Sequence, residues 1–168
     1  MSLSNEQKAA LKSLIVGNPT FNAYPNTPDG SLDLAVLLNT GTASPAFWIW
    51  RTSVSRAQVY NEVGPDGTTW NWTTYKSQTI TEQNTWVQMF MGDQADFTQA
   101  NFRAGVAAIF SGSAPANAQR DHILGVGRRQ ATHTEKLFAT GTGSTASPGV
   151  ATVTSVTYAD VYEARNLP

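Results

Sequence analysis

The stretch SNEQKAALKSLIVG, residues 4–17, opens the chain with a complete helix signal. Ser4 precedes Gln7 by three residues, which is the capping-box spacing that begins many helices. Apolar residues then repeat at helical spacing as far as Ile15, and a glycine ends the pattern. The sequence therefore predicts a first helix over residues 5–16.

The same kind of start signal recurs along the chain. Threonine stands three residues before an acidic residue at Thr79, Thr132 and Thr157, and each pair predicts a helix start. Apolar spacing predicts the remaining helices, which we place after a cap at Asp29 or Ser31 and near residues 54–60, 80–91, 98–110 and 116–126. The expected fold is mainly α, a small helical bundle with an extended C-terminal tail.

Two segments have a different character. A turn signal at Gly64–Gly67, followed by alternating Trp70 and Trp72, allows a short β-hairpin within residues 57–75. Residues 141–149, GTGSTASPG, have the composition of a flexible linker. We therefore expect three parts, which are a helical core domain over residues 1–140, the linker 141–149 and a C-terminal docking tail over residues 150–168.

Charge and length exclude several classes of function. The 168 residues suit one domain, and 11 Lys and Arg residues nearly balance 12 Asp and Glu residues. A nucleic-acid binder usually has a basic surplus, so tight phosphate binding is disfavoured. The one adjacent basic pair, Arg128 and Arg129, is a candidate partner-facing basic patch. The N-terminal residues predict neither a signal peptide nor a membrane anchor.

No catalytic, cofactor-binding or metal-binding constellation is evident. The chain has no cysteine, and its two histidines, His122 and His133, have no carboxylate at metal-ligand spacing between them. Gly141 and Gly143 match part of a dinucleotide-binding motif but follow an expected helix rather than a strand. An enzyme would need a pocket that brings a histidine together with carboxylates.

The aromatic content suggests a second use for apolar side chains. Seven Phe, five Tyr and five Trp residues stand in a chain that is only 14% charged. Aromatic residues are enriched at protein interfaces as well as in cores, so burial against neighbouring molecules and burial in a Trp-rich core are equally open. The candidate interface residues are Tyr158, Val161, Tyr162, Leu167, Trp48 and Trp50.

Four segments together resemble a known family. They are SPAFWIWRTSV (44–54), QANFRAG (99–105), RRQATHTEKLFATGTG (128–143) and DVYEARNL (160–167). Following an N-terminal helix, they are similar to a family of short virion-module proteins of tailed bacteriophages, over most of the chain. Residues 61–83 depart from the family pattern, which is more charged there.

The resemblance implies a structural role in a phage particle and no catalytic residues. Within that class we expect a head-tail connector, or adaptor, that forms a ring with copies of itself on the portal protein, at the head-tail junction of the virion. A downstream tail or stopper protein would be a further partner, and DNA would be only passing cargo. The alternatives are a capsid decoration protein, a tail structural protein and, more distantly, a small phage-encoded hydrolase. Synthesis would take place in the bacterial host cytoplasm.

Overall fold

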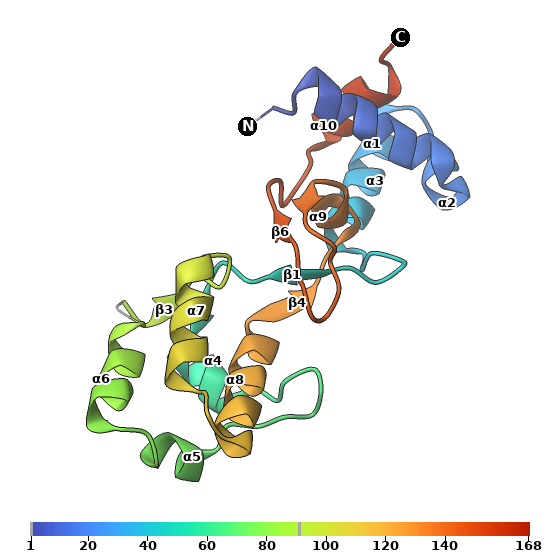
Figure 1. The fold of residues 1–168 in the computed structure, drawn as a ribbon. Coiled ribbons are helices and arrows are strands. Elements are labelled where there is room, and N and C mark those ends of the chain that lie inside the picture. The colour runs from blue at the N-terminus through green and yellow to red at the C-terminus, as the bar shows by residue number, and fades with distance from the viewer. Residues whose placement is uncertain (1, 91) are drawn as a thin grey trace. The chain divides into compact units, whose positions relative to one another are not determined.

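The computed structural model describes residues 2–90 and 92–168, and it confirms a mainly α fold, with 52% of residues in helices and only short two-stranded antiparallel sheets. The chain divides into two units (Figure 1). Unit 1 comprises residues 1–49 and 130–168, and unit 2 comprises residues 50–129. The chain leaves unit 1 in strand β1 (Trp48–Trp50) and returns in strand β4 (Arg128–Gln130), and these strands pair.

Unit 1 is built from both ends of the chain. Its elements are α1 (Asn5–Gly17), α2 (Pro19–Asn22), α3 (Pro28–Thr40), α9 (His133–Leu137), β5 (Ala139–Thr140), β6 (Val150–Ala151) and α10 (Tyr158–Arg165). α10 packs against both α1 and α3 (Figure 1). The core contains Leu11 and Ile15 of α1, Leu34 and Leu38 of α3, and Val161 of α10, all fully buried.

The glycine-rich segment 141–149, predicted as a flexible linker, is the loop of a hairpin. β5 and β6 pair antiparallel on either side of it, with Ala139 opposite Ala151. Two backbone bonds attach the loop to Trp48, whose N–H donates to Gly143 O and whose carbonyl accepts from Gly149 N–H. Gly143 has a φ of 65°, and a Cβ there would lie 2.2 Å from the Phe47 ring. The small residues that resemble a linker therefore make room for an aromatic side chain.

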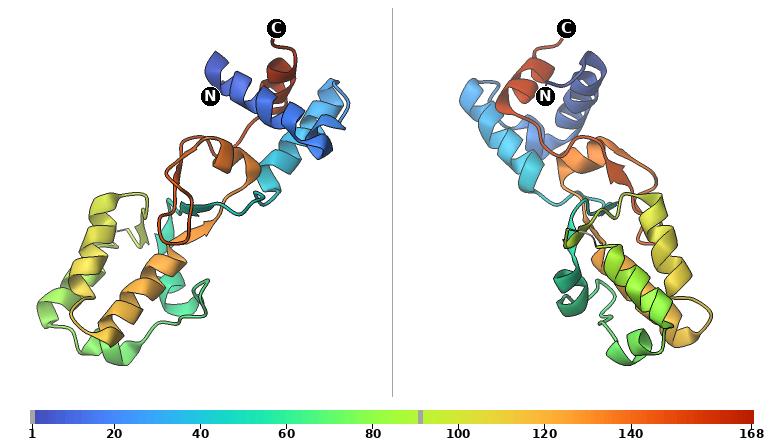
Figure 2. Two further views of the ribbon diagram at one scale, coloured as in Figure 1. Left: turned by 45° about the vertical axis from the view of Figure 1, so that its right-hand side comes forward. Right: turned by 90° about the vertical axis from the view of Figure 1, so that its left-hand side faces the viewer.

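Unit 2 is continuous in sequence. Its elements are β2 (Val54–Ser55), α4 (Arg56–Asn61), α5 (Trp72–Lys76), α6 (Ile80–Gln88), β3 (Gln94–Ala95), α7 (Ala100–Ile109) and α8 (Ala114–Val126). β2 and β3 pair antiparallel, with Val54 opposite Ala95. The yellow α7 and the orange α8 lie side by side (Figure 2).

Aromatic side chains fill the core of unit 2. Trp86 and Phe110 are fully buried and Trp70 nearly so. The rings of Trp70 and Trp86 stack with centroids 5.5 Å apart, and Phe110 meets Trp86 edge-on at the same centroid distance. Such pairs stabilise beyond the area that they bury. Core packing therefore accounts for part of the aromatic excess.

The helix-start signals are confirmed where a capping box was expected. The boxes at Ser4, Thr79, Thr132 and Thr157 all form. The cap of α3 is different, because the Thr27 side chain accepts from Gly30 N–H and the helix begins before Asp29. The helix expected over residues 80–91 ends at Gln88, and Met91 lies outside the described residues.

The hairpin considered for residues 57–75 does not form. Residues 57–61 belong to α4 and residues 72–75 to α5, with a loop between them. Trp70 and Trp72 do not alternate across a strand, and their rings pack edge-on with centroids 5.6 Å apart. Asn71 caps α5 by accepting from Thr74 N–H. Trp72 is therefore the first residue of a helix and not part of a strand.

Candidate interaction surface

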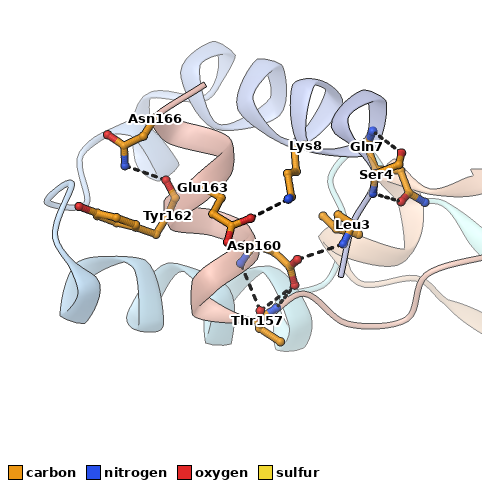
Figure 3. Close-up of polar contacts among 9 residues, drawn as sticks. All are labelled: Leu3, Ser4, Gln7, Lys8, Thr157, Asp160, Tyr162, Glu163 and Asn166. Carbon is orange, nitrogen blue, oxygen red and sulfur yellow. Dashed lines mark hydrogen bonds and ion pairs between the residues drawn. The ribbon is translucent and has the colours of Figure 1, made fainter. Parts of the chain in front are cut away.

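Polar contacts fix the C-terminal helix α10 to the N-terminal residues (Figure 3). Leu3 N–H donates to the Asp160 carboxylate at 3.2 Å, and the Lys8 ammonium lies 2.6 Å from the Glu163 carboxylate. One turn further along α1, Lys12 donates to the Leu167 carbonyl at 2.6 Å. The segment expected to be a docking tail is thus integrated into unit 1, and docking onto another molecule stays a prediction.

Asp160 combines two roles at the start of α10. Its carboxylate accepts from the backbone N–H and the hydroxyl of Thr157, which completes the capping box, and also from Leu3. Burial alone would raise the pKa of this carboxyl. The hydrogen bonds from Thr157 and Leu3, together with the Lys8 charge, outweigh burial and lower the pKa below its ordinary value of 3.8. The charged form therefore holds the helix start in place.

Helices α3 and α10 run antiparallel along a shared seam. At one end the Asn39 side chain donates to Val156 O at 2.7 Å and accepts from Val156 N–H at 2.9 Å. At the other end the Arg165 guanidinium donates to the carbonyls of Tyr24 and Pro25, just before α3. The end of α3 therefore meets the start of α10, and the start of α3 meets the end of α10.

Four large apolar side chains remain exposed along this seam. Leu32 and Val36 are one helical turn apart on α3, 51% and 54% exposed, and Tyr158 and Tyr162 are one turn apart on α10, 53% and 40% exposed. Leu32 and Val36 share a helix face with Asn39, and the two tyrosines share a face with Arg165, because residues spaced by four and seven lie on one side. Both of these faces border the seam. We call these four residues the α3–α10 patch.

The patch only partly matches the interface residues predicted from sequence. Tyr158 and Tyr162 are exposed as expected, whereas Val161 is fully buried in the core of unit 1 and is not accessible on this surface. Leu167 lies beyond the end of α10 and is half-buried. Leu32 and Val36 escaped prediction, since the apolar spacing of α3 indicates a helix without showing which side lies inside.

The two tryptophans predicted as interface residues, Trp48 and Trp50, lie in β1 and are half-buried. Trp48 is held by its backbone bonds to the hairpin loop of unit 1. Trp50 belongs to unit 2, where the Arg103 guanidinium lies 4.8 Å from its ring centroid in a cation–π contact. Structural roles within each unit thus account for part of the surface of both side chains.

The basic pair is divided between two environments. Arg128 is half-buried and forms an ion pair with Asp66, with 2.6 Å between nitrogen and oxygen. Arg129 is exposed. The first guanidinium thus stabilises the loop that contains Asp66, which leaves Arg129 as the more accessible member of the proposed basic patch.

The two histidines are packing residues in their own units. His122 is fully buried and its Nε2 donates to Val59 O at 2.8 Å. His133 packs edge-on against Phe21, with ring centroids 4.9 Å apart, and burial followed by the Lys136 charge lowers its pKa. His133 also lines a cavity of 280 Å³ with Leu14, Asn18, Phe21, Ser44, Lys136 and Leu137, a wall without a carboxylate.

The part of the chain that the structure describes offers little support for other kinds of chemical site. No group of three or more His, Asp or Glu side chains there is placed to hold a metal ion. None of the helices in residues 2–90 and 92–168 has the length and apolar character required to cross a membrane. Comparison with known proteins finds no matching family model, curated protein or solved structure.

Proposed function

We propose that this chain is a structural component of a tailed-bacteriophage particle, and specifically a head-tail connector. In this role copies of the chain form a ring on the portal and continue the DNA channel toward the tail. The family-like segments 44–54, 99–105, 128–143 and 160–167 support the assignment to a phage particle. They extend over both units of the structure.

The observation that carries the proposal is the α3–α10 patch. Full burial of a large apolar side chain is favourable by roughly 1.5–3 kcal/mol. The four half-exposed side chains of the patch therefore form a site where association with another molecule would be favourable. Clustered apolar side chains on a surface mark protein interaction sites more often than scattered ones do. A subunit of a ring requires such surfaces, because each copy contacts two neighbours.

The charge balance fits the same role. The chain carries 11 basic and 12 acidic residues, and DNA affinity rises with the number of phosphates that basic residues neutralise. A channel through which DNA slides works best without tight phosphate contacts. We expect the purified chain to show no DNA binding that survives moderate salt, and salt-resistant binding would contradict the connector role.

Native mass spectrometry tests the proposal directly. The purified chain is measured alone and mixed with the portal protein encoded in the same genome. A stoichiometric complex of portal and a ring of this chain is the expected result. Binding to assembled capsid shells or to tail tubes instead would assign the chain to decoration or to the tail, and binding to none of these would remove it from the particle.

A further inference from the structure

Unit 2 carries an exposed aromatic surface of its own. Trp72 is 50% exposed at the start of α5. Its ring lies 4.9 Å from that of Tyr60 and 5.9 Å from that of Tyr75, centroid to centroid. Both tyrosines are half-buried, so they support the indole from within. The three rings therefore pack as one cluster, and Trp72 is its exposed member.

Two basic side chains border these rings. Lys76 follows Trp72 by four residues on α5, and Arg56 precedes Tyr60 by four residues on α4, so each lies on the same helix face as an aromatic neighbour. Burial and Tyr60 raise the pKa of Tyr75, and the Arg56 charge opposes them. We call Trp72, Tyr60, Tyr75, Arg56 and Lys76 the aromatic-basic surface.

The α3–α10 patch has the opposite border. Asp29 and Asp33 are exposed on α3, three residues before Leu32 and Val36 respectively, and so lie on the adjoining helix face. Within the described residues, neither carboxylate is in an ion pair, and neither are Arg56 and Lys76. The apolar side chains of α3 are therefore edged by carboxylates outside any ion pair, and the aromatic side chains of unit 2 by cations outside any ion pair. Arg165, the one cation on the α10 side of the patch, is held by the Tyr24 and Pro25 carbonyls.

We propose that the aromatic-basic surface of one copy of this chain docks on the α3–α10 patch of the next copy. Trp72 packs against Leu32, Val36 and the two tyrosines, while Arg56 and Lys76 face Asp29 and Asp33. The contact joins two different surfaces, so it is head-to-tail and adds copies in series, as a ring requires. This pairing rests on the proposed function, for which it supplies the subunit interface.

Charge selects this pairing over a symmetric one. If the α3–α10 patch met its own copy, the border carboxylates of both chains would be brought to one interface, and self-pairing of the aromatic-basic surface would gather four cations. Like charges placed together at an interface are strongly unfavourable. The mixed pairing instead joins each acidic border to a basic one, and both partners are present on every copy.

Three variants test the pairing by sedimentation velocity and native mass spectrometry. The patch variant carries Val36→Lys and Tyr162→Lys, and the tryptophan variant carries Trp72→Glu. A control carries Val16→Lys, at an exposed apolar position of α1 outside both surfaces. The changed side chains are exposed, and far-UV circular dichroism establishes that each variant is folded. We expect the wild type and the control to associate alike, and each surface variant to associate about tenfold more weakly or worse.

Mixing the two surface variants gives the sharpest outcome. Each lacks a different half of the contact, so a one-to-one mixture retains one intact pairing and forms dimers at concentrations where either variant alone stays monomeric. A charge exchange adds a second measure, because Asp33→Lys and Lys76→Asp should each weaken association and together restore it. A monomeric wild type, variants that associate like the wild type, or a mixture without dimers would each overturn the pairing.

Failure of the pairing and failure of the connector role are separable. A chain that stays monomeric yet binds the portal overturns the proposed interface and keeps the connector role. A chain that associates through both surfaces but ignores the portal retains the interface and loses the connector role.

Discussion

Removing the Asp160 carboxylate should loosen both ends of the chain at once. In Asp160→Ala the carboxylate half of the α10 capping box is lost, because the Thr157 N–H and hydroxyl no longer have their acceptor, and this costs about 1 kcal/mol. The Leu3 N–H, which donates to Asp160 in a buried hydrogen bond, loses its partner, and an unsatisfied buried donor costs about 1–3 kcal/mol. The free energy of unfolding of unit 1 should therefore fall by roughly 2–4 kcal/mol.

Hydrogen exchange followed by mass spectrometry measures this loss locally. Peptides from α1 and α10 should exchange roughly 30-fold faster or more in the variant, because 1.4 kcal/mol corresponds to a factor of ten. Peptides from α6, which belongs to unit 2, serve as an internal reference within each sample. Asp121→Ala is the matched control, since its carboxylate is 61% exposed and meets only an adjacent arginine, so its effect should stay below about 0.5 kcal/mol.

The reasoning would be refuted if exchange in α1 and α10 were the same in Asp160→Ala and wild type. Acid offers a second check through Asp160→Asn. The pKa of Asp160 is lowered in the folded chain, so its charged form stabilises above the unfolded pKa of 3.8 and that contribution is lost as pH falls further. The difference in stability between wild type and Asp160→Asn should therefore shrink in acid.

Three other changes have defined outcomes. Gly127→Ala places a Cβ 2.0 Å from the Phe97 ring and should destabilise unit 2 by about 1–3 kcal/mol in urea unfolding followed by Trp fluorescence, whereas Gly17→Ala, with open space around it, should be neutral or slightly stabilising. His133 has a lowered pKa in the folded chain, so unit 1 should lose stability as pH falls below 6.5, and an undiminished pH dependence of urea unfolding in His133→Gln would contradict this. Arg103→Lys loses the planar contact with Trp50, and its shorter side chain draws back the nitrogen that donates to Phe97 O and Thr98 O. It should destabilise unit 2 by about 1 kcal/mol in the same unfolding assay, and Arg120→Lys, in an exposed ion pair, should change little.

Local signals carried most of the helix prediction. A capping box is complete within four residues, so Ser4, Thr79, Thr132 and Thr157 mark helix starts without information from the rest of the chain. The alternation of Trp70 and Trp72 wrongly indicated a hairpin, because the contact that decides their conformation is with a residue distant in sequence. Stacking of Trp70 on Trp86 overrides the local strand preference of a short aromatic run.

The candidate surface was harder to predict than the helices. Helical periodicity distinguishes faces but does not say which face a distant helix covers. Val161 and Tyr162 are adjacent in sequence but differ in burial. Val161 is buried in the core of unit 1, whereas Tyr162 is exposed beside the seam with α3. The place of Leu32 and Val36 beside α10 follows from the contacts of Asn39 and Arg165, which relate the ends of α3 to those of α10 and join residues distant in sequence.

The discontinuous build of unit 1 sets an order of events during synthesis. Residues 50–129 form a continuous unit, so that part can fold as soon as it leaves the ribosome, since domains fold as units from the N-terminal side. The first 49 residues must wait, because the helix that covers α1 and α3 begins at Tyr158. Nascent chains therefore expose Leu11, Ile15, Leu34 and Leu38 until α10 has been synthesised, and a product stalled or truncated before that helix would present those side chains to chaperones or to aggregation.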